Sequence, residues 1–261
     1  MSWSYGVTTV FPRLNTLLPA TLASLAKAGF NKPTLFVDGT GLSTTAVSCS
    51  KLVHLYEQAF PTLSLTFRQQ AVKCHAAWWL AFQELFLQDP GASYYALFQD
   101  DCAAYLNLCS YLERRPCPDD GYMNLYTATP GNEHIIRQES GQEKPVGWYE
   151  GVLKKRLDSD PSTYPWQLGI GAVGLVFPRK AAYALLTSPK MIEHACDKTR
   201  GWRKVDGAIV NAMNQAGFRE YIHNPSLLQH TGDHSTTGSM PMPYAATFLG
   251  EKVDALGFLK T

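Results

Sequence analysis

The first hundred residues alternate between short β-rich apolar runs and longer segments in which apolar residues recur at helical spacing. The β-rich runs are residues 5–10, 34–37, 63–67 and 94–98, and the helical patterns cover residues 14–25, 52–59 and 71–87. Strands that alternate with helices predict βαβ units, with parallel strands and helices on both faces of the sheet. We therefore expect an α/β fold, with a Rossmann-like, mostly parallel, twisted sheet flanked by helices. In such sheets ligands bind beyond the carboxyl ends of the strands.

The second half of the chain is less regular. We expect a strand at 123–127, an exposed polar loop at 130–145, a glycine-containing strand at 171–177, and helices at 179–186 and 206–216. Neither an internal repeat nor a linker divides the 261 residues, a length that suits one large α/β domain or two small ones. We expect a single domain.

The composition argues against a protein drawn onto nucleic acid or membranes by its overall charge. The formal net charge is +1, and basic residues gather only in short clusters at 114–115, 154–156 and 198–204. No apolar stretch approaches the ~20 residues of a spanning helix, and the N-terminus lacks the pattern of a secretory signal. The six cysteines form no C-x-x-C pair and no zinc spacing, which favours free buried thiols. We expect a cytoplasmic protein without membrane contact.

The segment Phe98-Gln99-Asp100-Asp101 ends the last of the early strands. Two adjacent carboxylates at the end of an apolar strand are costly to bury unless a positive charge pairs with them. A divalent cation such as Mn²⁺ or Mg²⁺ takes oxygen ligands and can also hold a diphosphate. The alternative is structural, because aspartate is favoured at the start of a helix and the pair could cap the helix that follows.

Two later residues are candidates for the same chemistry. His230 lies between a short apolar run and a Gly/Ser-rich tail, and imidazole is a suitable ligand for a metal of the Mn²⁺ type. Asp206 enters a predicted helix, where a carboxylate could accept a proton from a hydroxyl group. Each residue also has a structural alternative, a packed histidine in one case and a helix cap in the other.

The order of these motifs along the chain resembles that of the GT-A class of glycosyltransferases. In that class a nucleotide-binding α/β half ends in a D-x-D-type motif, a glycine-containing strand and an acidic position follow, and a late histidine completes the metal site. The segment Gln229–Ser235 is also similar to a segment of N-acetylglucosaminyltransferase IV-type enzymes and of bacteriophage glycosyltransferases. The resemblance covers residues 7–235. It implies a nucleotide-binding half at 1–101 and an acceptor-binding half with a C-terminal tail at 102–261.

The resemblance implies a role for each candidate residue. Asp101 and His230 would bind the metal ion, and Asp100 would lie near the ribose or a metal-bound water. Gln99 departs from the class, in which an acid is common at this position, so the site would have one carboxylate fewer. Asp206 would be the catalytic base of a direct displacement, which inverts the anomeric centre.

Four further residues would bind the nucleotide. Thr8 and Thr9 lie at the end of the first strand, Asp38 would contact the uracil or the ribose, and Arg68 would lie near the base or the diphosphate. Asp38 could instead belong to an Asp-Gly turn, and Arg68 could be a surface charge. Residues 169–174 read G-x-G-x-x-G but do not open a helix, which favours a strand against the donor sugar over a dinucleotide site.

The expected function is transfer of a hexose from a UDP-sugar to an acceptor hydroxyl. The segment at 229–235 that is similar to phage enzymes (the phage-like segment) and the basic clusters favour a hydroxymethylated pyrimidine in DNA as the acceptor. A glycan or a small molecule is the alternative. A DNA enzyme would flip the target base out of the helix and bind phosphates in a salt-dependent manner. The other hypotheses are a metal-dependent nucleotidyltransferase or phosphohydrolase, which would use more acids, and a non-catalytic nucleotide- or sugar-binding module.

Overall fold

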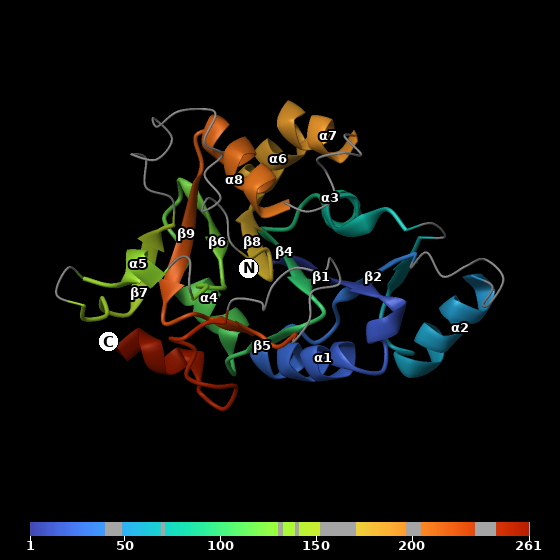
Figure 1. The fold of residues 1–261 in the computed structure, drawn as a ribbon, viewed down its shortest axis with the longest axis horizontal. Helices are drawn as coiled ribbons and strands as arrows, with labels where there is room; N and C mark the ends of the chain where they lie inside the picture. The colour runs from blue at the N-terminus through green and yellow to red at the C-terminus, as the bar shows by residue number, and fades with distance from the viewer. Residues whose placement is uncertain are drawn as a thin grey trace.

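The computed structural model describes residues 1–39, 49–68, 71–129, 133–138, 141–151, 171–196, 205–232 and 244–260. An eight-stranded sheet forms its centre, with the strand order β3-β2-β1-β4-β8-β6-β9-β7 (Figure 1). The strands are β1 (Trp3–Val10), β2 (Thr34–Asp38), β3 (Leu65–Phe67), β4 (Tyr94–Gln99), β6 (Gly121–Asn124), β7 (Gly147–Glu150), β8 (Gly174–Pro178) and β9 (Arg219–Asn224).

Most strands of this sheet run in one direction. β3, β2, β1 and β4 are parallel to their neighbours, and β6 is parallel to β9. β8 is antiparallel to both β4 and β6, and β7 is antiparallel to β9. The predicted mostly parallel sheet is confirmed, and one sheet runs through both predicted halves of the chain.

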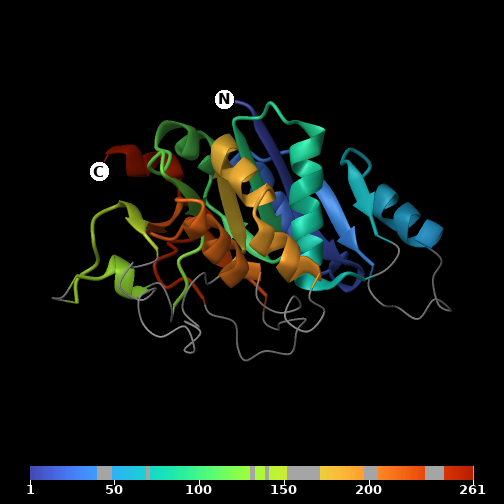
Figure 2. The ribbon, with the colours of Figure 1, turned by 90° about the horizontal axis from the view of Figure 1, so that it is seen from above.

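Helices cover both faces of the sheet. In Figure 1, α3, α6, α7 and α8 lie above the sheet and α1 lies below it, and Figure 2 shows α3, α6 and α8 crossing the strands. A two-stranded sheet, β5 (Cys102–Ala104) with β10 (Leu228–His230), packs against α1. The helices are α1 (Leu17–Ala28), α2 (Cys49–Ala59), α3 (Lys73–Gln88), α4 (Leu108–Arg114), α5 (Glu133–Ile136), α6 (Arg179–Leu186), α7 (Pro189–Cys196) and α8 (Val205–Gln215), with short 3-10 helices η1 (Phe11–Arg13) and η3 (Ala255–Lys260).

Alternate residues of the strands supply two hydrophobic cores. In β4, Ala96 and Phe98 belong to the core on the α1 side, whereas Tyr95 and Leu97 belong to the core on the α3 side. Successive side chains of a strand point to opposite faces, so a strand buried on both faces needs a continuous apolar run. That requirement explains why residues 94–98 form a continuous apolar run.

The elements predicted in the first half are confirmed to within a few residues at their ends. α1 ends at Ala28 and is capped by Gly29, whose φ of 102° is the left-handed conformation that glycine favours. Among the described residues, no helix combines the length and the hydropathy of a membrane span.

The predictions for the second half need correction. The helix predicted at 179–186 is confirmed as α6. The strand predicted at 123–127 is β6, which ends earlier, at Asn124. β8 begins at Gly174, because the residues before it form a turn. The segment at 130–145 is not all loop, since it contains the one-turn helix α5.

Candidate active site

Asp100 and Asp101 follow β4 at the edge of the sheet where parallel strands end together. The register pairs Thr8 of β1 with Gln99 of β4, and β2 ends on the other side of β1. Both aspartates are buried, with 3% and 2% of their surface exposed. The pair therefore lies where ligands bind to sheets of this kind.

Arg13 provides the positive charge that two buried carboxylates require. It ends η1, which directly follows β1 at the same edge of the sheet. Its Nη1 lies 2.5 Å from Asp100 Oδ1 and 2.7 Å from Asp101 Oδ2. Arg13 belongs to no motif recognisable in the sequence. Its position just after a strand predicted to end beside the aspartates was the available signal.

The chain itself holds both oxygens of Asp100. Thr9 Oγ1 donates a hydrogen bond to Asp100 Oδ2 at 2.6 Å, and Arg13 contacts Oδ1. Thr21 Oγ1 donates to the Asp100 carbonyl at 2.9 Å, which fixes the backbone. Burial raises the pKa of Asp100 above its ordinary value, although Arg13 and Thr9 favour the charged form.

His230 lies beside Asp101 because β10 pairs with β5. The antiparallel register places His230 opposite Cys102, and Thr231 N–H donates to the Asp101 carbonyl at 2.8 Å. His230 Nε2 is 3.2 Å from Asp101 Oδ2. Burial alone would raise the pKa of Asp101, but His230 and Arg13 outweigh burial and lower this pKa below its ordinary value. Negative charge is therefore concentrated on Asp101.

The Asp101–His230 pair fits a divalent ion. Asp101 Oδ1 is buried and has no hydrogen-bond partner in the part of the chain that the structure describes, and the buried His230 Nε2 contacts only Asp101 there. The 3.2 Å between His230 Nε2 and Asp101 Oδ2 is close to the separation of about 3 Å expected for adjacent ligands of an octahedral ion. Gly232 closes over the pair, since a Cβ there would lie 2.8 Å from Asp101 Oδ2 and 3.0 Å from His230 Cε1.

The described residues offer few protein ligands beyond this pair. Among them, no group of three or more His, Cys, Asp and Glu side chains is arranged to hold a metal ion. Among the described residues an ion would thus have two protein ligands, Asp101 and His230, which leaves positions for substrate and water. Exchangeable positions of this kind are usual for Mg²⁺ bound together with substrate phosphates.

Asp206 ties α8 to the turn before β8. It lies in the first turn of α8, and its Oδ2 accepts a hydrogen bond from the Gly171 N–H at 2.8 Å. Gly171 has a φ of 87°, in the left-handed region. Burial raises the pKa of Asp206 above its ordinary value. Asp206 lies in the first described turn of α8, where a carboxylate also stabilises a helix, so the structural alternative stays open.

The Cys74 thiol lies near three of the predicted acids. This side chain is exposed near the start of α3, which corrects the expectation that the free thiols are all buried. Protein nevertheless surrounds the thiol on its other sides. Burial, followed by the charges of Asp206, Asp101 and Asp38, raises the pKa of Cys74 to about 12. Three predicted acids from separate segments thus lie close enough to this thiol to raise its pKa.

The other predicted nucleotide-binding residues bind partners within the protein. Thr8 Oγ1 donates to the Phe98 carbonyl at 3.3 Å, Asp38 Oδ1 accepts from the Val72 N–H at 2.9 Å, and Arg68 Nη2 pairs with Glu84 Oε1 at 2.6 Å. Arg68 is therefore largely neutralised by α3. The basic clusters at 154–156 and 198–204, and residues 233–235 of the phage-like segment, lie outside the described residues.

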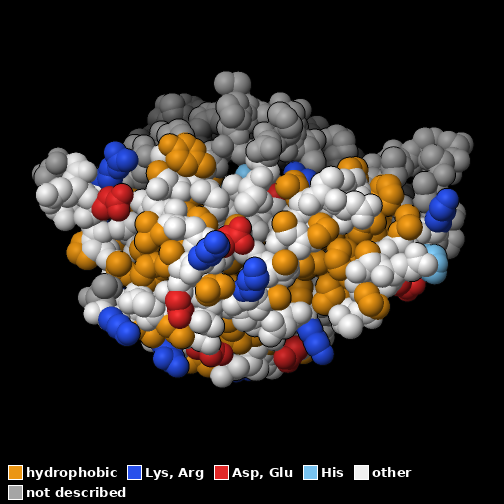
Figure 3. All heavy atoms as spheres, turned by 90° about the horizontal axis from the view of Figure 1, so that it is seen from below, with side chains coloured by type: hydrophobic (Ala, Val, Ile, Leu, Met, Phe, Trp, Pro, Cys, Tyr) orange, Lys and Arg blue, Asp and Glu red, His pale blue; other side chains and the backbone are white. Residues whose placement is uncertain are grey.

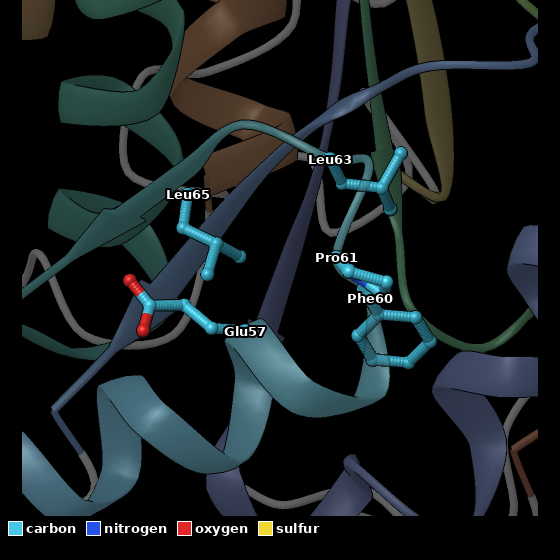
Figure 4. Close-up of a pocket in the computed structure, with 5 residues that line it drawn as sticks. All are labelled: Glu57, Phe60, Pro61, Leu63 and Leu65. Carbon is cyan, nitrogen blue, oxygen red and sulfur yellow. The ribbon is translucent and has the colours of Figure 1, made fainter.

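A separate pocket lies between α2 and β3 (Figure 4). It is lined by Glu57, Phe60, Pro61, Leu63 and Leu65. No candidate site residue lines it, and it lacks the convergent polar groups that orient a ligand. The acidic edge of the sheet, not this pocket, is the candidate site.

No protein-family model matches the chain, and no curated protein matches its sequence. Among solved structures it is similar to the crystal structure of GalNAc-T7 with UDP, GalNAc and Mn²⁺, with a TM-score of 0.55 and 14% identity. The chain has a GT-A fold. The match covers 88% of this chain and 44% of that chain, so the chain spans less than half the length of GalNAc-T7 in that structure. The narrower similarity to N-acetylglucosaminyltransferase IV-type and phage enzymes stays a prediction.

Proposed function

We propose that the chain is a metal-dependent glycosyltransferase that moves a hexose from a UDP-sugar to an acceptor hydroxyl. The main support is the Asp101–His230 pair at the carboxyl edge of a GT-A sheet, where both side chains are buried and Asp101 Oδ1 has no hydrogen-bond partner among the described residues. A second support is the structural neighbour, GalNAc-T7, which was solved with UDP and Mn²⁺.

Asp101 and His230 would hold Mn²⁺ or Mg²⁺ in this proposal. The bound ion would neutralise charge on the departing diphosphate. Thr9 and Asp100 hold each other, so their part would be to fix the end of β4 beside the ribose. Thr8, Asp38 and Arg68 would line the nucleotide end of the same edge.

Asp206 would accept the proton of the acceptor hydroxyl. Its raised pKa brings it closer to working pH, which favours proton acceptance by a carboxylate. The Gly171 N–H holds Oδ2, which fixes the orientation of the carboxylate. A base that acts directly on the acceptor gives inversion at the anomeric carbon.

The acceptor we propose is a hydroxymethylated pyrimidine in DNA, with a glycan or a small molecule as the alternative. The support is the resemblance of residues 229–235 to phage enzymes. Figure 3 shows acidic and basic side chains interspersed on the face that it displays, so a DNA-binding surface would have to lie elsewhere. A cytoplasmic location goes with this proposal.

The donor reaction tests the proposal. Purified protein is incubated with UDP-hexoses and Mn²⁺, and UDP release is measured with hydroxymethylated DNA, simple glycans or no acceptor. We expect metal-dependent UDP release that chelator and Asp101→Ala abolish. Asp120→Asn is the control, because Asp120 pairs on the surface with Arg219. Release that persists in Asp101→Ala would refute the metal mechanism, and no binding of any UDP-sugar would refute the function.

A metal-dependent nucleotidyltransferase or phosphohydrolase is the less favoured function. Such enzymes gather several acids around their ions, and no such group of three occurs among the described residues. A non-catalytic binder is distinguished in the same assay, because it would bind UDP without transferring sugar to any acceptor.

A further inference from the structure

We propose that Arg13 and the divalent ion compete for Asp101, and that the diphosphate of the nucleotide relieves this competition by binding Arg13. The inference rests on the proposed function, because the ion and the diphosphate are those of the UDP-sugar reaction. It assigns a role to an arginine that no sequence motif singled out.

The contacts of Asp101 show that Arg13 and the ion would bind the same carboxylate. A single nitrogen, Arg13 Nη1, reaches Asp100 at 2.5 Å and Asp101 Oδ2 at 2.7 Å. Asp101 Oδ2 is also the oxygen that lies 3.2 Å from His230 Nε2. An ion bound by Asp101 and His230 would thus share a carboxylate that already carries a cation.

The charges make the two cations exclude each other. With both acids ionised, Asp100, Asp101 and Arg13 together carry a single net negative charge. A dication added beside Arg13 would meet a like charge a few ångströms away, where low dielectric makes the repulsion strong. The ion would bind more tightly if Arg13 left the pair.

Arg13 is placed so that it can leave. It ends a short 3-10 helix, and 13% of its side chain is exposed, more than that of either aspartate. A guanidinium binds phosphate oxygens with paired hydrogen bonds and retains its charge at all working pH values. The diphosphate of a donor arriving at this edge offers Arg13 such a partner. Metal and nucleotide would therefore bind cooperatively.

The test measures Mn²⁺ binding without any turnover. The electron paramagnetic resonance signal of free Mn²⁺ is titrated with wild type and Arg13→Gln, each with and without UDP. We expect Arg13→Gln to bind Mn²⁺ alone about tenfold more tightly, since one charged hydrogen bond no longer has to be broken. UDP should raise the Mn²⁺ affinity of wild type more than that of the variant, because the two ligands are coupled through Arg13.

Arg219→Gln is the matched control. Arg219 also bridges two acids, Asp120 and Glu150, but on the surface, and its loss should leave Mn²⁺ binding unchanged. Arg13→Lys is the second site variant in case the glutamine variant does not fold. A lysine keeps the positive charge but has one ammonium group in place of the guanidinium, so we expect a Mn²⁺ affinity between those of wild type and Arg13→Gln.

The outcomes separate the two proposals. If wild type binds Mn²⁺ with UDP but neither Arg13 variant that folds binds Mn²⁺ alone more tightly, the competition is refuted and the proposed function stands. If no form of the protein binds Mn²⁺ with or without UDP, the proposed function fails and the competition with it.

Discussion

At the residue scale, Glu220 is a buried acid whose charge depends on pH. It lies on β9 with 3% of its surface exposed, and its Oε1 accepts a hydrogen bond from Asn124 at 3.1 Å. Burial raises the pKa of Glu220 from 4.5 to about 7, with the charge of Asp206 adding to this effect. A pKa that is higher in the folded state stabilises the protein below the unfolded value, and this stability is lost as pH rises from 4.5 to about 7.

Replacing Glu220 with glutamine should remove this pH dependence. We expect Glu220→Gln to raise the free energy of unfolding by about 3 kcal/mol at pH 8 and to change it little at pH 4, measured by denaturant unfolding. Glu193→Gln is the control, because Glu193 is exposed on α7 and pairs only with Lys190 in the described structure. An equal effect of Glu220→Gln at both pH values would contradict the buried charge.

Asp206 allows a sharper test of catalysis than a truncation does. Asp206→Asn keeps an oxygen that can accept the Gly171 N–H, so the turn before β8 should stay in place. We expect transfer to fall by about 10²- to 10⁴-fold, the usual contribution of a general base, with UDP affinity unchanged. Single-turnover transfer and UDP calorimetry measure the two quantities. Transfer within a few-fold of wild type would exclude Asp206 as the base.

The sequence singled out three side chains that the structure brings together, Asp100, Asp101 and His230, but not the arginine beside them, and their roles stay a prediction. Asp100, Asp101 and His230 were recognisable because carboxylates at a strand end and a late histidine have a limited set of partners. Arg13 was missed because its role depends on which strands are neighbours. β1 and β4 are far apart in the chain, and only their parallel pairing brings Arg13 to the aspartates.

At the element scale, the short β10 strand brings His230 to Asp101 and so completes the proposed metal site. Gly232, just after β10, packs so closely on Asp101 and His230 that a Cβ would lie 2.8 Å from Asp101 Oδ2. We expect Gly232→Ala to weaken Mn²⁺ binding by about 10- to 100-fold, as changes beside metal ligands do. Gly257→Ala is the control, since a Cβ at Gly257 meets nothing within 4 Å. Unchanged Mn²⁺ affinity in Gly232→Ala would mean that Asp101 and His230 do not hold the ion.

β9 shows why several elements of the second half were not predicted. Its sequence, Arg219–Asn224, has no apolar run, yet five of its six residues are buried. The polar side chains are accommodated by partners from other segments, such as Tyr111, whose hydroxyl lies 2.6 Å from His223 Nε2. Polar residues buried by tertiary partners give no periodic signal, whereas the apolar β4 does.

At the scale of the whole molecule, the site joins segments that are distant in the chain. Arg13 follows β1, Asp101 follows β4, Asp206 lies in the first turn of α8, and His230 ends β10. The sheet brings the first two together and the small β5–β10 sheet adds the last. The order of motifs along the chain could be predicted, because a βαβ fold places successive strand ends at one edge. The antiparallel direction of β8 and β7 could not be predicted, since the side chains of a strand do not reveal which way it runs.

Such a site should couple ligand binding to global stability. Ligands that bind only the folded state raise the free energy of unfolding, by about 2.7 kcal/mol at 100 times the dissociation constant. For a chain of this size we expect UDP with Mn²⁺ to raise Tm by roughly 5–10 °C, measured by scanning calorimetry. Mn²⁺ alone should give a smaller shift, because Arg13 holds the pair. Asp101→Ala should abolish the shift due to Mn²⁺, and Glu193→Gln should retain it. An equal shift in Asp101→Ala, or in excess chelator, would show that the nucleotide binds without a metal ion at this edge.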